Sequence, residues 1–363
     1  MKSRILLFVT AMTLFAALAA QASTRKLITF NVAGGGPGAY QGTTTMGISA
    51  KGAIAGSYYD AQGASHGFVR DRDGTITTFD PKRSISTTVY GLNEHGAITG
   101  WYYDKNNVGH GFVRTPKGKF TTFDAPEAGT GAGQGTFGSN INAAGTITGT
   151  TIDANYVVHG IVRNPHGAIT TFDVPGGGTG NNQGVWTTGF YALNPEGAFT
   201  SPYMDSNNAF HGFLRDADGT ITTFDVPGAG TGAFQGTIPG SINPNFAIVG
   251  WYYDTDSASH GFRRDPKGVI ITIDVVGAGT GAGQGTFIAA NNPSAAISGY
   301  YVDANNVAHG FVGTPHGVIT TFDVPAAGTG AGQGTFVTGN NASGSISGYY
   351  VDSNNGYHGF LLK

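Results

Sequence analysis

Short runs of alternating apolar and polar residues recur along the whole chain and predict β-strands rather than helices. The segment from Gln284 to Val324 shows the pattern clearly: four such runs are separated by turns that contain Asn, Asp, Pro or Gly. β-Branched and aromatic residues alternate with polar ones, as half-buried strands require. The strands expected in this segment cover residues 285–291, 296–302, 309–312 and 318–323.

Close copies of this segment fill the chain, so the predicted architecture is repetitive. The last three copies of a His-Gly-Phe element lie 49 residues apart. Four short strands in a repeat of this length fit one blade of a β-propeller, because leucine-rich repeats are shorter and helical repeats need a 3.6-residue pattern. The histidines that mark the copies are His66, His110, His159, His211, His260, His309 and His358.

The two ends of the chain supply complementary parts of one repeat. The last copy ends at Lys363 after its third strand, and the segment Arg25–Asn31 has the sequence of the missing fourth. We therefore predict an all-β fold, a seven-bladed β-propeller of four-stranded repeats of about 49 residues. The ring is expected to close when the amino-terminal strand pairs with the carboxy-terminal blade, which leaves few exposed strand edges. Residues 23–363 are expected to form this single domain.

Residues 1–22 have the features of a secretory signal peptide. Lys2 and Arg4 precede an apolar run, Ile5–Ala19, that is too short for an ordinary membrane span. An Ala-Gln-Ala triplet ending at Ala22 matches a small-x-small cleavage site. An uncleaved anchor is the alternative interpretation. We expect cleavage after Ala22 and a secreted or periplasmic protein.

Composition and charge exclude several classes of partner. The chain has no cysteine, so an exported form must be held together by its core and by ring closure. Only 11% of the residues are charged and the formal net charge is −3, which gives no footprint for nucleic acid or an anionic membrane. We predict no nucleic-acid partner, no membrane span after signal cleavage and no cofactor; a monomer is compatible with these features.

Several repeated motifs look chemical but are expected to be structural. An Asp precedes each marker histidine by six residues, as in Asp303 and His309. Such pairs suit acid–base catalysis or metal binding, but an active site needs one arrangement and not a copy in every repeat. We therefore expect the Asp and the His to satisfy buried backbone groups. The run Asp71–Gly74 suggests a calcium loop, but sister copies lack its ligands, so we predict a hairpin turn and no metal site.

Two crossings between repeats differ from the others, and pockets tend to lie at such asymmetries. The crossing after Asp80 is short and carries Lys82 and Arg83, which we expect to edge a notch. A later crossing is long and brings Trp186 and Tyr191, which we expect to form an aromatic wall. Drift in weakly constrained repeats is the alternative explanation for both differences.

Trp101 and Trp251 are further candidates for stacking against sugars, because each precedes a Tyr-Tyr pair at the end of a predicted strand. We identify no catalytic residue. The candidate ligand-binding residues are Lys82, Arg83, Trp101, Trp186, Tyr191 and Trp251.

One copy of the repeat resembles a known family. It reads Gly-Leu-Asn-x-x-Gly-x-Ile-x-Gly over residues 91–100 and His-Gly-Phe-Val over residues 110–113. This resembles the HAF-type repeats of secreted bacterial proteins, and the likeness covers essentially all of the chain after residue 22. The chain departs from that pattern in having Gly in place of Ala after the histidine and Thr-Phe-Asp in place of Asp-Leu-Gly. The resemblance implies export and a β-repeat fold, and it implies no catalytic residues.

These observations favour a secreted, non-enzymatic binding or surface-interaction protein, with a polysaccharide or cell-surface glycan as the candidate ligand. One alternative is a polysaccharide-acting enzyme, a lyase or a hydrolase, with its site around Lys82, Arg83 and Trp186. A second alternative is a structural component of an extracellular matrix or coat.

Overall fold

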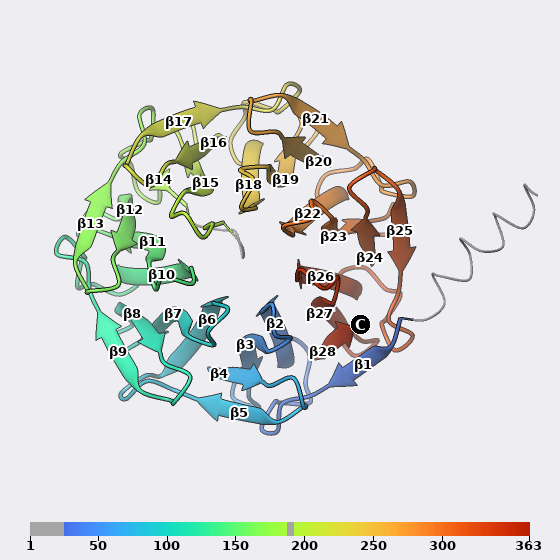
Figure 1. Ribbon diagram of the computed structural model, residues 1–363, viewed down its shortest axis with the longest axis horizontal. Coiled ribbons are helices and arrows are strands. Elements are labelled where there is room, and N and C mark those ends of the chain that lie inside the picture. The colour runs from blue at the N-terminus through green and yellow to red at the C-terminus, as the bar shows by residue number, and fades with distance from the viewer. Residues whose placement is uncertain (1–24, 187–191) are drawn as a thin grey trace, which may run out of the picture.

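The computed structural model describes residues 25–186 and 192–363; the predicted signal peptide lies outside this range. All regular elements within these residues are β-strands. Figure 1 shows the strands in radial groups about a central axis, with the first strand of a group near the axis and the last at the perimeter. Radial repetition of four-stranded groups is the architecture of a β-propeller, which confirms that the fold is all-β and of the β-propeller type. No helix in the described part is long and apolar enough to cross a membrane.

Each group is an antiparallel unit whose strands pair in chain order. The alternation of side chains sets this pattern, since one face of each strand must be buried against a neighbouring unit. Unit 1 contains β2 (Gly42–Ile48), β3 (Ile54–Tyr59), β4 (Ser65–Arg70) and β5 (Ile76–Phe79); unit 2 contains β6 (Ser86–Leu92), β7 (Ile98–Tyr103), β8 (Gly109–Arg114) and β9 (Phe120–Phe123); unit 3 contains β10 (Gly135–Ile141), β11 (Ile147–Ile152), β12 (Val158–Arg163) and β13 (Ile169–Phe172).

The later units repeat this plan, and the strands predicted from the sequence in unit 6 agree with the structure to within one residue at each end. Unit 4 contains β14 (Gly184–Val185), β15 (Phe199–Met204), β16 (Phe210–Arg215) and β17 (Ile221–Phe224); unit 5 contains β18 (Gly236–Ile242), β19 (Ile248–Tyr253), β20 (Ser259–Arg264) and β21 (Ile270–Ile273); unit 6 contains β22 (Gly285–Asn291), β23 (Ile297–Val302), β24 (Ala308–Gly313) and β25 (Ile319–Phe322); unit 7 contains β26 (Gly334–Asn340), β27 (Ile346–Val351) and β28 (Tyr357–Leu362).

The amino-terminal strand β1 (Leu27–Phe30) lies beside the last strand of the chain. It pairs antiparallel with β28, and Leu27 is the partner of Leu362. The main chains of Lys26 and Lys363 exchange two hydrogen bonds of 2.9 and 3.0 Å. β1 therefore occupies in unit 7 the perimeter position that β5 has in unit 1.

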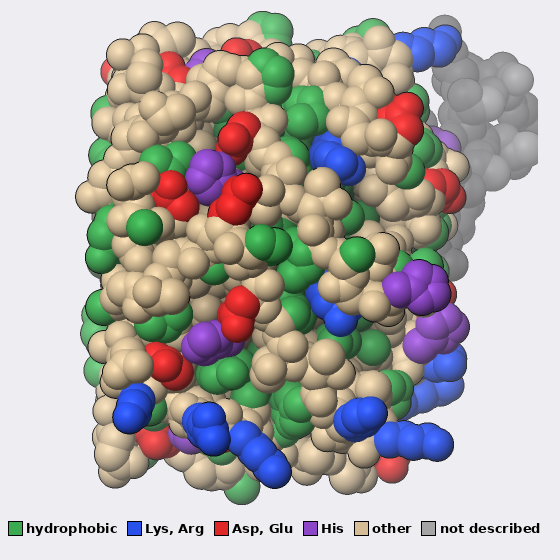
Figure 2. Space-filling view, turned by 90° about the vertical axis from the view of Figure 1, so that its left-hand side faces the viewer, with side chains coloured by type: hydrophobic (Ala, Val, Ile, Leu, Met, Phe, Trp, Pro, Cys, Tyr) green, Lys and Arg blue, Asp and Glu red, His purple; other side chains and the backbone are tan. Residues whose placement is uncertain are grey.

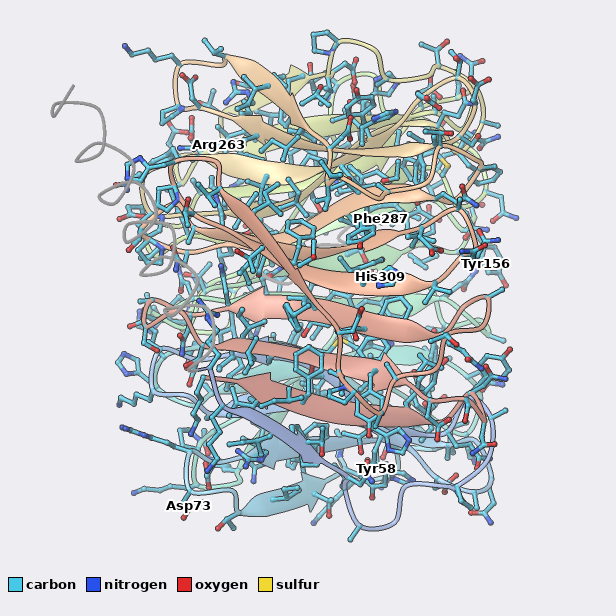
Figure 3. All side chains as sticks on the ribbon, turned by 90° about the vertical axis from the view of Figure 1, so that its right-hand side faces the viewer. Tyr58, Asp73, Tyr156, Arg263, Phe287 and His309 are labelled. Carbon is cyan, nitrogen blue, oxygen red and sulfur yellow. The ribbon has the colours of Figure 1, made fainter. Side chains whose placement is uncertain are left out.

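The perimeter strands and the two ends of the units carry the polar groups. Figure 2 shows that part of this outer surface bears scattered charged side chains, with histidines beside acidic groups. The turns between the second and third strands lie at one end of the units together with the long crossings, and Figure 3 shows Tyr156 of one such turn at that end. Asp73, in the β4–β5 hairpin, lies at the other end. That hairpin is the turn predicted from the sequence, with Gly74 at a φ of 101°.

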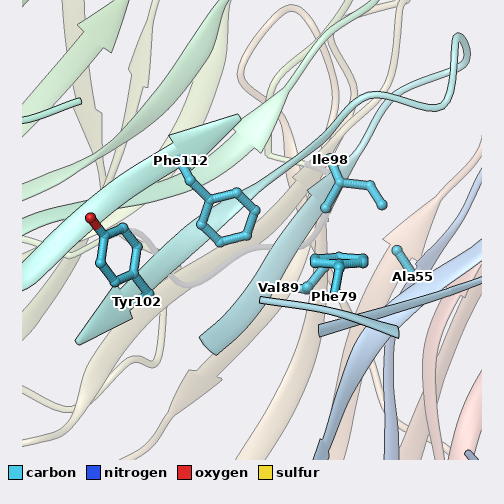
Figure 4. Close-up of a cluster of buried hydrophobic side chains, with 6 residues drawn as sticks. All are labelled: Ala55, Phe79, Val89, Ile98, Tyr102 and Phe112. Atoms are coloured by element: carbon cyan, nitrogen blue, oxygen red, sulfur yellow. The ribbon is translucent and has the colours of Figure 1, made fainter. Parts of the chain in front are cut away.

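The hydrophobic core is divided into clusters that lie between neighbouring units. In the cluster drawn in Figure 4, Phe79 of unit 1 packs with Val89 and Phe112 of unit 2. A cluster of the same kind joins Ile48 of unit 1 to Leu361 of unit 7. No unit buries its apolar side chains alone, so stability depends on the contacts between units.

A glycine at the start of the innermost strand joins a unit to the one before it. In unit 6, Gly285 has a φ of 116° and forms a parallel bridge with Ser259 of unit 5. A Cβ atom on Gly285 would overlap the carbonyl oxygen of Ser259. Both the backbone conformation and the space therefore require glycine. Unit 2 differs, because its innermost strand begins with Ser86, whose hydroxyl lies 2.7 Å from that of Ser65.

The short crossing into unit 2 also lacks a link that other crossings have. In unit 6, the Oε1 atom of Gln284 accepts a 2.9 Å hydrogen bond from the backbone N–H of Gly281. Its Nε2 atom donates a 3.2 Å hydrogen bond to the carbonyl of Ala304, which ties the glycine-rich crossing to the neighbouring turn. Residues 80–85 contain no glutamine, so this tie cannot form between units 1 and 2.

Candidate functional site

A stacked pair of aromatic rings bridges the first two strands of units 6 and 7. Phe287, labelled in Figure 3, stacks on its cross-strand partner. That partner is Tyr300, and the ring centroids lie 4.9 Å apart at an interplanar angle of 13°. Phe336 and Tyr349 repeat this pair at 5.1 Å and 9°. Burial raises the pKa of both tyrosines, so their hydroxyl groups stay neutral.

The corresponding pair in unit 3 has lost one ring. Phe137 of β10 is paired across the strands with Thr150 of β11, where units 6 and 7 have tyrosine. A cavity of about 240 Å³ lies beside these two residues. The described residues that line it are Tyr90, Trp101, Tyr103, Phe137, Ser139, Thr150, Ile152, Val158 and Trp186.

The residues that line the cavity form its wall, and contacts among them hold the aromatic rings in place. Trp101 lies between Tyr90, at a centroid distance of 5.1 Å, and Phe137, at 5.7 Å. The Nε1 atom of Trp186 donates a 3.0 Å hydrogen bond to the carbonyl of Asn182, which orients the indole. These aromatic side chains come from three neighbouring units, so the packing of those units, rather than any single strand, assembles the cavity.

The cavity is neutral. Burial raises the pKa of Tyr90 to about 12, so its hydroxyl keeps its proton. The other polar side chains among the described lining residues are Trp101, Tyr103, Ser139, Thr150 and Trp186, and none of the lining residues is a carboxylate, an imidazole or a cation. Such a site favours a ligand with an apolar face and a few hydroxyl groups.

The structure brings together two of the six predicted ligand-binding residues, Trp101 and Trp186, which both line this cavity. Trp251 lies elsewhere, in unit 5, where its ring packs against Phe287 at 5.9 Å. Lys82 and Arg83 are exposed on the short crossing and are not among the described lining residues. Tyr191 lies outside the described residues.

Trp186 reaches the cavity for a reason that differs from the expected one. The sequence Gln-Gly-Val-Trp at residues 183–186 continues the repeat register of Gln-Gly-Thr-Phe at residues 134–137. Trp186 is therefore the unit 4 counterpart of Phe137, and the extra residues of the long crossing come after it. Phe137 and Thr150 were missed, although aligning the repeats exposes the exchange of an aromatic residue for Thr150.

Each marker histidine lies between two polar partners instead of contacting backbone groups. In unit 1, Nδ1 of His66 lies 2.7 Å from Asp80, and Nε2 lies 3.3 Å from Asp60. The ring of Tyr58 stacks on the imidazole at a centroid distance of 5.0 Å. The prediction that these histidines satisfy backbone groups was wrong, because the Asp of the Thr-Phe-Asp element, as in Asp80, supplies a side-chain partner for the imidazole.

The structural role predicted for the turn Asp is confirmed. Oδ1 of Asp60 accepts hydrogen bonds from the backbone N–H groups of Gln62 and Ala64, at 2.8 and 2.9 Å. The same arrangement recurs from unit to unit, as at Asp303. Within residues 25–186 and 192–363, no group of three or more His, Asp or Glu side chains is arranged to hold a metal ion.

Stability is expected to be highest between about pH 4 and 6.5 and to fall as the pH rises through the titration of these histidines. Hydrogen bonds to Asp225 raise the pKa of His211 above its ordinary value of 6.5, and hydrogen bonds to similar partners outweigh burial and raise the pKa of His66 and His260. Their contribution is complete below pH 6.5 and is lost above the raised pKa. Desolvation acts to raise the pKa of Asp60, but hydrogen bonds outweigh it and lower the pKa below 3.8, so its contribution is lost only in stronger acid.

Thermal unfolding measured between pH 4 and 8 checks this expectation. Replacing His66, His211 and His260 together by Gln should flatten the decline in Tm on the alkaline side. The matched control is His166→Gln, because His166 is exposed in a hairpin turn. A triple variant that keeps the parental pH profile would contradict the assignment.

A second cavity, of about 160 Å³, lies at the carboxyl ends of the innermost strands. Asparagines from successive turns link the units there: Nδ2 of Asn93 donates to the carbonyl of Asn142 at 2.9 Å, and Nδ2 of Asn341 donates to the carbonyl of Ser49 at 3.0 Å. The sequence predicts the turn that each Asn opens but not this link to the next unit. Asn194 is 1% exposed, and its Nδ2 atom has no hydrogen-bond partner among the described residues.

Comparisons with known proteins relate the chain to others through its fold. No protein-family model and no curated protein sequence matches it. A streptogramin B lyase structure superposes with a TM-score of 0.57 at 16% identity, covering 93% of this chain and 98% of that one. A catalytically inactive virginiamycin B lyase from Staphylococcus aureus with quinupristin gives 0.55 at 16% identity, with 93% and 99% covered. A lectin from Burkholderia pseudomallei gives 0.52 at 8% identity, with 88% and 98% covered. At these identities the likeness shows the fold alone, so the chain is similar in its β-propeller fold both to lyases and to a lectin.

Proposed function

We propose that the chain forms a closed seven-bladed β-propeller that binds a neutral carbohydrate and is secreted after removal of residues 1–22. Export is supported by the sequence of those residues and by the resemblance to HAF-type repeats. Closure is supported by links between units 7 and 1 that match those between internal neighbours. Gly42 forms a parallel bridge with Tyr357 as Gly285 does with Ser259, and the Arg70 guanidinium lies 5.1 Å from the Phe30 ring centroid.

The main support for carbohydrate binding is that the ring of Phe137 has no aromatic residue as its cross-strand partner. In units 6 and 7 a tyrosine ring covers the equivalent phenylalanine, whereas Thr150 leaves that place open in unit 3. A six-membered sugar ring offers a flat apolar face of the kind that stacks on an aromatic side chain. The cavity of about 240 Å³ is close to the lower end of the usual range for small-molecule sites, about 300 Å³. It suits one such ring.

The neutral wall favours an uncharged sugar. A carboxylate or ammonium group placed among Tyr90, Trp101 and Trp186 would lose water without gaining an opposite charge. The hydroxyl groups of Ser139 and Thr150 are near enough to the cavity to bond a neutral sugar.

The chemistry of the wall favours binding over glycoside hydrolysis. Hydrolysis uses a pair of carboxyl groups that flank the scissile bond, one as acid and one as base or nucleophile. The described lining residues supply neither a carboxylate nor an imidazole. Lys82 and Arg83, the candidate residues of an enzymatic site, lie on an exposed crossing instead.

Replacing Thr150 with Tyr is expected to abolish binding without disturbing the fold, because units 6 and 7 accommodate tyrosine at the same position. The full mature chain is tested for retention on immobilised cellulose, mannan and chitin, and Kd is measured for the polymer that retains it. We expect Kd to rise at least about tenfold, since the new ring displaces the sugar and the tenfold change corresponds to 1.4 kcal/mol.

Two control variants make this test specific. Thr150→Val keeps the shape of the side chain and should preserve most of the binding. Tyr300→Thr removes a ring in unit 6 and should leave binding at unit 3 unchanged. Absence of retention of the parent chain on all three polymers, or equal affinity of Thr150→Tyr and the parent, would reject the proposed site.

A further inference from the structure

Four aromatic residues have φ angles in the left-handed region, which suits glycine or asparagine. One of them, Phe246, packs against the core cluster around Ile242 and Ile248, and the other three lie in crossings or in a turn between the second and third strands. Tyr40, Tyr156 and Phe234 have φ angles of 62°, 62° and 63°, in the left-handed region. Most sister units have Gly at the position of Tyr40 and Phe234, as in Gly283 and Gly332. Most have Asn at the position of Tyr156, and the exceptions are Gly63 and Ser257. A non-glycine residue in this region costs roughly 1 kcal/mol or more.

Folding does not compensate for this strain at Phe234. Its side chain is 66% exposed, and no other ring in the described part of the chain packs on it. Tyr156 is 37% exposed, and its side chain makes one hydrogen bond, from the hydroxyl to the carbonyl of Ala132. Tyr40 differs, because its ring contacts Tyr357 at a centroid distance of 6.4 Å and so has a packing role between units 7 and 1.

Tyr156 and Phe234 are connected to the wall of the cavity by short hydrogen-bonded paths. The carbonyl of Asn182 accepts the indole N–H of Trp186, and the backbone N–H of Asn182 donates to the carbonyl of Tyr156 at 2.8 Å. The next residue, Gln183, donates to the side chain of Asn208 at 3.0 Å, and Asn208 accepts the backbone N–H of Phe234. The two exposed rings therefore follow the cavity along the same end of units 3, 4 and 5, the end at which Figure 3 shows Tyr156.

We propose that Tyr156 and Phe234 are outer subsites that stack on the flanking sugars of a neutral polysaccharide whose central ring occupies the cavity. This inference rests on the proposed carbohydrate binding and adds that the ligand is a chain rather than a single sugar. The largely exposed carboxylates of Asp173 and Asp225, in units 3 and 4, disfavour an acidic polysaccharide there. The separate weak contacts add because one chain joins them.

The test compares ligands of different length on variants that carry the sister residues. Kd is measured for the glucose, mannose and N-acetylglucosamine monomers and for their β-1,4-linked hexamers. Phe234→Gly and Tyr156→Asn should each raise Kd for a hexamer by roughly three- to tenfold, the effect of losing one aromatic stacking contact. Kd for the monomer should stay unchanged. Tm should stay the same or rise, because the variants relieve the strained backbone.

Tyr40→Gly is the matched control, since it changes a ring with the same backbone conformation at the junction of units 7 and 1. It should leave both affinities unchanged. Parental hexamer affinity in the double variant Tyr156→Asn, Phe234→Gly would overturn the outer subsites while leaving the cavity site intact. A loss of monomer and hexamer affinity in equal measure would also overturn them, because the residues would then act through the cavity. A parent chain that binds neither length would reject the cavity and the outer subsites together.

Discussion

Removal of residues 23–31 is expected to prevent the mature chain from folding, rather than merely to lower its Tm. These residues include β1, whose Ile28 and Phe30 pack against the cluster between units 7 and 1. Burial of such side chains contributes about 2 kcal/mol each, and the net stability of a domain is only about 5–15 kcal/mol. The truncation also exposes the hydrogen-bonding edge of β28, which favours aggregation. Soluble yield, circular dichroism and thermal unfolding measure the effect.

A circular permutant distinguishes the effect of removing β1 from the effect of moving the chain ends to another place. Lys26 and Lys363 already exchange backbone hydrogen bonds, so a short glycine linker can join the two ends. New ends placed in the crossing 276–283 leave every strand intact, and this chain is expected to fold with nearly the parental Tm. A truncated chain that unfolds at the parental temperature would show that β1 contributes little and would contradict the proposed closure.

The substitution Gly285→Ala is expected to destabilise the protein by about 3 kcal/mol or more. The added methyl group meets the carbonyl oxygen of Ser259, a backbone atom that cannot move without breaking the bridge between units 5 and 6. A left-handed backbone costs roughly 1–3 kcal/mol for a residue with a side chain, and overpacking costs about as much again. Denaturant unfolding monitored by tryptophan fluorescence measures the change.

Ser86→Ala provides the control at the one innermost strand that begins with serine. Ser86 is not bridged to β4 in the described structure, and its hydroxyl makes one hydrogen bond, to Ser65. Its removal is expected to cost about 1 kcal/mol. If the two variants lost equal stability, the glycine bridge would contribute no more to the free energy of unfolding than the hydrogen bond of Ser86 does.

The strands and their order could be predicted because every repeat carries the same signals. Alternation of apolar residues sets each strand, and the Asn and Asp turns with their following Gly set the ends. The offset of the two chain ends also predicted that β1 would serve the last unit, and the register of Leu27 with Leu362 agrees. The link from Asn93 to the carbonyl of Asn142 could not be predicted, because it depends on how closely one unit approaches the next.

The candidate site was only partly predictable. Its cavity arises where one repeat differs from the others, and no sequence motif marks that place. Trp101 was chosen because it precedes a Tyr-Tyr pair and Trp186 because it lies in the long crossing, and the structure places both at the cavity. Thr150 drew no attention because threonine is ordinary in a strand. Its importance becomes clear only by comparison with units 6 and 7, where a tyrosine stands at the same position, beside Phe287 and Phe336. Lys82 and Arg83 were chosen for the unusual length of their crossing, and length alone does not place a side chain near a cavity.

The short crossing has a consequence for where neighbouring units would separate first. Between units 1 and 2 the described structure lacks the glycine bridge and the glutamine tie, and Ser49 stands where other units have an asparagine amide. What remains there is mainly the apolar cluster around Phe79 and the Arg114 guanidinium 4.6 Å from its ring centroid. Transient opening should therefore begin at this junction, at residues 80–85 in the first third of the chain, while the terminal strands β1 and β28 stay paired.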